Sequence, residues 1–196
     1  MEKRIRPTKV VTGEGVLSYL NCWEPHAMDE SSIAKYSVSF VFPKSDTKTY
    51  DKIVAAMKAA YEEGADKLKS SSGKLPPFDV KSDKLKMALR DGDDRYSESG
   101  DETYKDCWFV NASSKEQPGV VDRNKVEIMD TREMYSGVIG RVSMNFYAYN
   151  KNGNKGIAAG LQNIQKIRDG QPLGGKSRAE DDFDDEYSSS EDEDFL

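Results

Sequence analysis

The sequence predicts a mainly β protein, a small antiparallel barrel or sandwich with helical insertions, followed by a disordered acidic tail. Short segments that alternate apolar and polar residues recur along the chain, separated by Gly, Pro and Asn turn signals. They lack the regular strand and helix alternation of a parallel sheet. With 196 residues, the chain suffices for one domain with a core. We therefore expect a folded domain over residues 1–175 and a tail over residues 176–196.

The first part of the chain predicts two strands and a helix. Residues 15–23, GVLSYLNCW, read as a strand closed by a Glu-Pro step. Residues 35–43, KYSVSFVFP, alternate cleanly and stop at a proline. Residues 45–64 carry apolar side chains at helical spacing and end at Gly64, which predicts an amphipathic helix.

The middle of the chain predicts loops and short strands. Residues 65–84 are polar and broken by one glycine and two prolines, which indicates a surface excursion that does not pack. Residues 84–94 predict a short strand that runs into an Asp-Gly turn, and residues 97–102 a loop. Residues 104–114, YKDCWFVNASS, predict another strand, and residues 114–124 a loop with a Pro-Gly turn.

Residues 137–156 carry the clearest strand and hairpin signal. Apolar side chains alternate with polar ones up to an Asn-Gly turn. The next segment, residues 156–170, GIAAGLQNIQKIRDG, has apolar positions at helical spacing and ends at Gly170. We expect a hairpin strand followed by a second amphipathic helix.

The charge of the chain is unevenly divided. All 29 Lys and Arg precede residue 180, whereas 10 of the 35 acids lie in residues 180–196, so residues 1–179 sum to 29 − 25 = +4. The basic body and the acidic tail can therefore bind each other, and an anion that binds the body must compete with the tail.

Several functional classes fit the sequence poorly. Cys22 and Cys107 have no motif spacing and His26 is the single histidine, which argues against a zinc or Cys/His nucleophile site. The opening MEKRIRPTKV lacks the apolar core of a signal peptide, and no apolar run approaches a membrane span. We expect a cytoplasmic protein with buried free thiols, no cofactor, no metal and no membrane contact.

Two motifs resemble enzyme sites. Residues 170–177, GQPLGGKS, match the pattern of a phosphate-binding loop, but they follow a predicted helix and run into an acidic segment that cannot supply the required helix. We interpret them as a helix cap and a linker. The acids of residues 91–102 could hold Mg²⁺ for a nuclease, or simply form a polar turn, and no lysine is placed as a general base.

One face of the predicted hairpin strand is unusual. It carries Arg141, Asn145, Tyr147 and Tyr149, a cation, an amide and two phenol rings, where a solvated face more often carries Lys, Glu, Thr and Ser. Unpaired bases stack on rings and their phosphates need cations, so such a face suits a single nucleic-acid strand. The two tyrosines could equally pack under a loop or helix.

Other candidates for DNA contact are less specific. Trp108 could stack on a base, but a core role is commoner for tryptophan. Five cations lie in or beside predicted loops, where phosphates are easily reached: Arg90, Arg95, Lys115, Arg123 and Lys155.

Taken together, several stretches resemble a known family. LSYLNCWEP, FVNASSKEQPGVVD and the segment from Tyr135 to Gly175 are similar, in order and spacing, to the single-stranded DNA-binding proteins of tailed bacteriophages and prophages. The family was once catalogued only as a domain of unknown function. The resemblance implies an OB-fold elaborated with helices that binds single-stranded DNA without sequence preference in phage DNA replication or recombination, in the host cytoplasm. The oligomeric state stays open.

The tail allows two further roles. Its side chains could imitate DNA on the basic body, or dock on a replication or recombination protein once DNA has displaced the tail. The ending EDEDFL is similar to the tails of other bacterial and phage single-strand binders, which implies docking. The residues expected to bind a partner are Phe183, Tyr187, Asp194, Phe195 and Leu196. Alternatives are an adaptor that acts mainly through the tail, a Mg²⁺-dependent nuclease, an acidic nucleic-acid mimic, and a merely solubilising tail.

Overall fold

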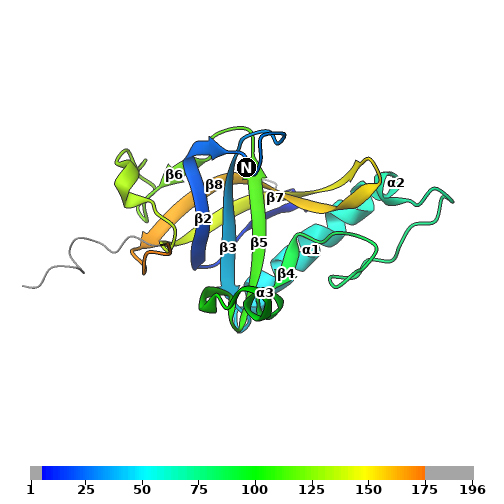
Figure 1. Ribbon diagram of the computed structural model, residues 1–196, viewed down its shortest axis with the longest axis horizontal. Coiled ribbons are helices and arrows are strands. Elements are labelled where there is room, and N and C mark those ends of the chain that lie inside the picture. The colour runs from blue at the N-terminus through cyan, green and yellow to red at the C-terminus, as the bar shows by residue number, and fades with distance from the viewer. Residues whose placement is uncertain (1–5, 175–196) are drawn as a thin grey trace, which may run out of the picture.

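The computed structural model describes residues 6–174 (Figure 1). None of the helices in that part of the chain is long and apolar enough to span a membrane. The whole of the expected tail, residues 176–196, lies outside the described residues, and so do the side chains expected to bind a partner, Phe183, Tyr187, Asp194, Phe195 and Leu196.

Five strands close a barrel. The strands of the structure are β1 (Lys9–Val11), β2 (Gly15–His26), β3 (Lys35–Pro43), β4 (Leu89–Asp91), β5 (Cys107–Ser114), β6 (Gly119–Val121), β7 (Ile139–Lys151) and β8 (Asn154–Arg168). The barrel runs β2-β3-β5-β8-β7 and back to β2, with a parallel pair between β5 and β8 and antiparallel pairs elsewhere. This five-stranded Greek-key barrel confirms the expected mainly β, OB-fold-like class.

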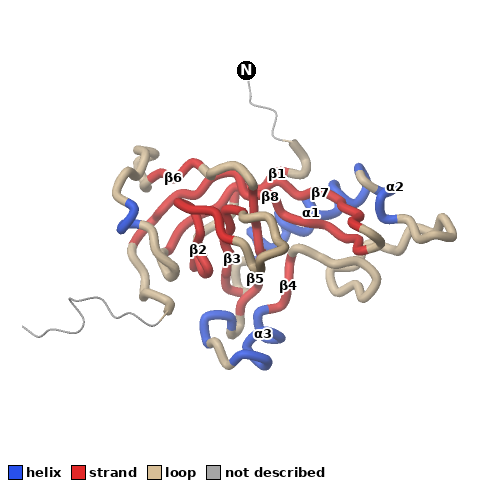
Figure 2. The backbone as a smooth tube through the Cα atoms, turned by 45° about the horizontal axis from the view of Figure 1, so that its top comes forward, coloured by secondary structure: helices blue, strands red, loops and turns tan. Residues whose placement is uncertain are grey.

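Helices lie at the margins of the barrel (Figure 2). They are α1 (Thr47–Glu63), α2 (Ala65–Leu68) and α3 (Gly92–Ser99), with short 3₁₀ turns η1 (Glu102–Tyr104) and η2 (Thr131–Glu133). The predicted helix over residues 45–64 is confirmed as α1. Its first turn is capped by Asp46, whose side chain accepts a hydrogen bond from the Thr49 amide at 3.0 Å. Ile53 and Met57 are fully buried and attach α1 to the barrel core.

The predicted helix over residues 156–170 is wrong, because this segment is strand β8. Its first buried side chains, Ile157, Ala159 and Leu161, alternate as a strand requires. The pairing with β7 then shifts by one residue, and Ile164 becomes the next buried side chain. The bulge therefore spaces Ile157, Leu161 and Ile164 by four and three residues, which imitates a helical stripe.

The prediction that residues 65–84 do not pack is also wrong. Leu68, at the end of α2, is fully buried in the core. The Phe78 ring lies 5.5 Å from the Tyr61 ring of α1, and the Tyr61 hydroxyl donates a hydrogen bond to the Pro76 carbonyl at 2.6 Å. Few apolar side chains anchor this polar segment, so its composition alone suggests a loop.

Three predicted turns or loops contain regular structure. The Asp-Gly turn is the start of α3, because Asp91 accepts a hydrogen bond from the Asp93 amide at 3.0 Å and caps the helix. A Cβ at Gly92 would lie 2.2 Å from the Tyr104 carbonyl oxygen, so this glycine permits close packing. The loop predicted over residues 97–102 belongs to α3 and η1, and the loop over residues 114–124 contains β6.

Candidate nucleic-acid interface

The outer side of β3 and β5 forms an open polar surface. Val38 and Phe40 of β3 and Val110 and Ala112 of β5 point into the core, so the side chains between them point outward. We call this surface the strand face. It comprises Lys35 and Ser37 of β3, Asn111 and Ser113 of β5, and Lys86 and Arg90 of the neighbouring segment. In OB-folds the second and third barrel strands, here β3 and β5, commonly carry the oligonucleotide or oligosaccharide site.

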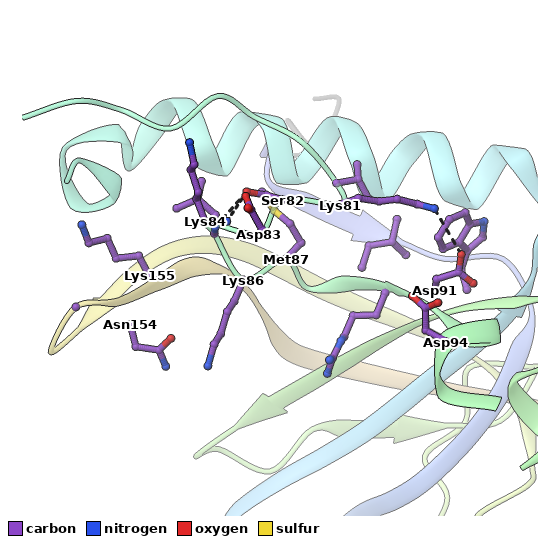
Figure 3. Close-up of a pocket in the computed structure, with 16 residues that line it drawn as sticks. Lys81, Ser82, Asp83, Lys84, Lys86, Met87, Asp91, Asp94, Asn154 and Lys155 are labelled. Atoms are coloured by element: carbon purple, nitrogen blue, oxygen red, sulfur yellow. Dashed lines mark hydrogen bonds and ion pairs between the residues drawn. The ribbon is translucent and has the colours of Figure 1, made fainter. Parts of the chain in front are cut away.

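An inserted segment supplies two of these cations. β5 and β8 pair directly only at Ala112 and Ser113, and they are joined beyond that point by residues 86–91. The Lys86 carbonyl accepts a hydrogen bond from the Ile157 amide at 2.9 Å, and β4 pairs with β5. Because Leu85 and Leu89 point into the core, Lys86 and Arg90 point outward, and Figure 3 shows Lys86 directed away from α1.

The strand face continues across β8 to the tyrosines of β7. Ser113 pairs with Gly160 of β8, whose missing side chain leaves room for the Tyr147 ring 3.7 Å from an ideal Cβ. Tyr147 is 45% exposed. Burial, and then the nearby Tyr147, raise the pKa of Tyr149, which therefore stays an uncharged phenol at neutral pH. Small residues thus separate a cationic edge from a pair of tyrosine rings.

Two grooves border the strand face. A groove of about 540 Å³ lies beside the loop of residues 27–34, where the side chains of Lys35 and Lys151 accompany the exposed apolar side chains of Met28 and Ile33. A groove of about 600 Å³ on the other side is lined by five cations and three acids. The cations are Lys81, Lys84, Lys86, Arg90 and Lys155, and the acids Asp83, Asp91 and Asp94. Within residues 6–174, neither Lys86 nor Arg90 forms an ion pair.

Two of the expected DNA contacts have structural partners beside this groove. The Trp108 ring is partly buried, 5.1 Å from the Tyr50 ring and 4.8 Å from the Lys44 ammonium. The Lys155 ammonium donates a hydrogen bond to the Lys69 carbonyl at 2.5 Å and ties the β7–β8 hairpin to the end of α2. Both line the groove, and both also hold the fold together.

Other expected contacts lie away from the strand face. Arg141 and Arg123 line a hollow on the outer side of β7 and β8, across the barrel from β3, and Arg141 donates a hydrogen bond to the Thr12 carbonyl at 2.9 Å. Asn145, by contrast, pairs with Gly160 beside Tyr147, where the strand face continues onto β7, and its side chain accepts a hydrogen bond from the Thr8 hydroxyl at 2.8 Å. Lys115 is exposed just beyond the end of β5. The sequence-based set is therefore split between two sides of the barrel.

The two enzyme-like motifs have structural surroundings of their own. Residues 170–174 follow strand β8 and not a helix, which corrects one premise of the sequence argument, and the Leu173 amide donates to the Ser136 carbonyl at 2.8 Å. The last residues of that motif lie outside the described chain.

Two acids of the second motif, residues 91–102, form ion pairs. Lys44 pairs with Asp91 at 2.7 Å and with Asp93 at 2.6 Å. Within residues 6–174, no group of three His, Cys, Asp or Glu side chains could hold a metal ion.

Sequence reasoning missed several residues of this surface. Lys35 and Lys151 were detectable as the polar ends of predicted strands that flank turns. Lys86 carried no signal, because its position between β5 and β8 depends on an insertion into the barrel. Tyr19, 58% exposed on β2, stood unnoticed among the apolar residues of a predicted strand.

The fold and this surface define the class of the protein: an OB-fold barrel with helical insertions and a basic, ring-bearing strand face. Comparison with known proteins then places it. The family model described as "Enterobacter phage Enc34, ssDNA-binding protein" matches residues 8–196, and the chain belongs to that family. This confirms the resemblance drawn from the sequence.

Individual proteins support the placement. The putative protein p50 of Acyrthosiphon pisum secondary endosymbiont phage 1 is 31% identical over 188 residues, which cover 92% of this chain and 94% of that protein. The single-stranded DNA-binding protein of bacteriophage Enc34, solved in complex with ssDNA, is similar in fold, with a TM-score of 0.66 at 19% identity over 88% of this chain and 96% of that one. The single-stranded DNA-binding protein gp2.5 of bacteriophage T7 has a TM-score of 0.56 at 17% identity, over 96% of this chain and 97% of that one.

Proposed function

We propose that the protein binds single-stranded DNA without sequence preference and catalyses no reaction. One observation carries the proposal: Lys86 and Arg90, without ion-pair partners within residues 6–174, lie on the strand face across β8 from the rings of Tyr147 and Tyr149. The complex of the related Enc34 protein with ssDNA supports it.

Two kinds of side chain bind the single DNA strand. The ammonium of Lys86 and the guanidinium of Arg90 neutralise phosphates, and the released counterions drive binding. Unpaired bases stack on Tyr147 and Tyr149, each stacked base contributing about 1–3 kcal/mol. Every base has a stacking face and every nucleotide a phosphate, so this arrangement does not select a sequence. DNA contact by Arg123 and Arg141 stays a prediction, for a second region across the barrel.

We further propose that residues 1–175 are the DNA-binding domain and residues 176–196 a separate acidic segment that regulates it. The ten acids after residue 179 resemble a phosphate backbone in charge and compete with DNA for the strand face. DNA displaces the segment, and Phe183, Tyr187, Asp194, Phe195 and Leu196 become available to phage or host proteins of DNA replication or recombination.

A second candidate is an adaptor whose main task is to recruit such a protein. The terminal EDEDFL, four acids followed by an aromatic and an aliphatic residue, favours it. Deletion of residues 180–196 separates the two functions. A binder holds DNA equally well or more tightly after the deletion, whereas an adaptor loses its protein partner.

The decisive experiment is a fluorescence titration with labelled single-stranded and double-stranded oligonucleotides of the same sequence at two salt concentrations. The full chain and the deletion variant are compared. We expect a preference for single strands in both proteins, and tighter binding by the deletion variant. Equal binding of both kinds of DNA by both proteins would contradict the proposal, and Mg²⁺-dependent cleavage would instead indicate a nuclease.

A further inference from the structure

Helix α3 and turn η1 lie at one end of the barrel, next to the ends of β4 and β5 (Figure 2). Tyr104 of η1 is fully buried there. Its hydroxyl lies 3.2 Å from the Ser39 hydroxyl and 3.4 Å from the Ser18 hydroxyl, and it donates to this pair. The insertion is therefore attached to the barrel through the outward-pointing side chains of β2 and β3.

Next to this attachment, Tyr19 of β2 has an unusual backbone. Its φ angle is +46°, in the left-handed region that bulky side chains rarely adopt, and the pairing of β2 with β3 is irregular between Ser18 and Asn21. Such conformations cluster at ligand sites, where the surrounding structure holds them. The irregularity leaves the Tyr19 side chain 58% exposed on the outside of the barrel.

Arg95 of α3 lies between two aromatic rings. Its guanidinium carbon is 5.0 Å from the centre of the Tyr104 ring and 5.5 Å from that of Tyr19. One terminal nitrogen donates to the Tyr19 hydroxyl at 3.3 Å. The Nε atom is buried without a hydrogen-bond partner among the described residues. Arg95 also forms no ion pair within residues 6–174, so the guanidinium can bind an anionic oxygen ligand.

This cluster adjoins the strand face. The Asn21 amide donates a hydrogen bond to the Ser37 hydroxyl at 3.1 Å, and Ser18 pairs with Ser39. Single-stranded DNA that crosses β3 toward β2 thus meets the exposed Tyr19 ring first and the Arg95 cation beside it. An unpaired nucleotide offers the two groups that match, a flat base and an anionic phosphate.

We propose that Tyr19 and Arg95 form a nucleotide subsite in which the base stacks on the Tyr19 ring and the phosphate binds the Arg95 guanidinium. The subsite rests on the proposed binding of single-stranded DNA, and it extends the path of the strand beyond β3 to β2 and α3. It also gives the α3 insertion a function, because the insertion carries the cation.

The test is Tyr19→Asn, because asparagine tolerates a positive φ and the change removes the ring without adding backbone strain. Tyr19→Phe is the matched control, since it keeps the ring. Oligo-dT and an abasic oligomer of equal length are titrated against each variant. We expect Tyr19→Asn to weaken oligo-dT binding by about 5-fold to 150-fold, the range of one stacked base. Binding of the abasic oligomer by Tyr19→Asn should be unchanged. Tyr19→Phe loses only the hydrogen bond from Arg95 and should bind oligo-dT more tightly than Tyr19→Asn.

Arg95→Gln tests the phosphate contact separately. We expect the slope of log K against log salt to become shallower by about 0.7, whereas Tyr19→Asn leaves the slope unchanged. If both variants melt earlier but bind oligo-dT like wild type, the cluster only holds α3 in place and the subsite is wrong. If the wild-type protein itself does not bind oligo-dT, the proposed function fails, and the subsite fails with it.

Discussion

Replacing both cations of the inserted segment should change the salt dependence of DNA binding by a calculable amount. Lys86 and Arg90 lie on the strand face, and neither has an ion-pair partner within residues 6–174. Each cation that neutralises a phosphate contributes about 0.7 to the slope of log K against log salt on a single strand. The double variant Lys86→Gln/Arg90→Gln should therefore have a slope smaller in magnitude by about 1.4.

The difference in slope predicts the difference in affinity. If the plots of log K against log salt for wild type and double variant meet at 1 M salt, a slope difference of about 1.4 weakens DNA binding by the double variant about 10-fold at 0.2 M salt and about 60-fold at 0.05 M. The assay is quenching of protein fluorescence by oligo-dT at four or more salt concentrations. Lys58→Gln is the control, because it removes the same charge as a single replacement from the exposed side of α1.

The stability of the variants needs a separate measurement. The Arg90 guanidinium lies 5.8 Å from the centre of the buried Phe109 ring, so Arg90→Gln could also loosen the packing there. Lys86→Gln alone touches no ring and should remove about half of the slope change, with an unchanged melting temperature. If Lys86→Gln and Lys58→Gln have the same slope as wild type, the strand face does not carry the phosphates.

Three predictions concern the fold. Leu68→Ala should destabilise the protein by about 2–5 kcal/mol in urea unfolding, because Leu68 is fully buried; a loss below about 0.5 kcal/mol would mean that α2 does not pack. Gly156→Ala should lower the melting temperature and weaken DNA binding, because the new Cβ would lie 2.0 Å from the Lys86 carbonyl oxygen. Gly160→Ala, with 3.4 Å to its nearest atom, is the control for the melting temperature. Burial raises the pKa of the Cys22 thiol from 9.0 to about 11, so the thiol ionises first in the unfolded chain. The stability that the neutral buried thiol contributes is therefore present below pH 9 and is lost as the pH rises through 11. Cys22→Ala should reduce the fall in the free energy of unfolding between pH 9 and 11, and an unchanged pH dependence would contradict the burial argument.

Strands with regular alternation were predictable from the sequence. In β7 the buried residues Val142, Met144 and Phe146 alternate with outward residues, and the Asn-Gly turn after them adopts positive φ at both positions. Local sequence therefore determined both the element and the direction of its side chains. The outward set included Tyr147, which the structure places on the side of the barrel that continues from β5.

Prediction failed where one residue changes the period or where contacts come from distant parts of the chain. The bulge in β8 converts strand alternation into apparent helical spacing, although Gly156 and Gly160 inside the segment already weaken a helix. The cap at Asp91 needs the packing of Gly92 against Tyr104, which no local pattern contains.

The same distinction explains why the site was harder to predict than the fold. The cations nearest the centre of the strand face come from residues 86–91, which lie between β5 and β8 and replace their direct pairing. The ring and cation at the other end come from an irregularity in β2 and from α3, which is itself an insertion. In this protein the regular barrel strands supply mainly serine, asparagine and glycine, a flat floor that one strand of DNA can cross. The regular strand β7 adds the rings of Tyr147 and Tyr149, which its alternation identifies. The irregular segments supply Lys86, Arg90, Tyr19 and Arg95, and these binding groups depend on the three-dimensional arrangement.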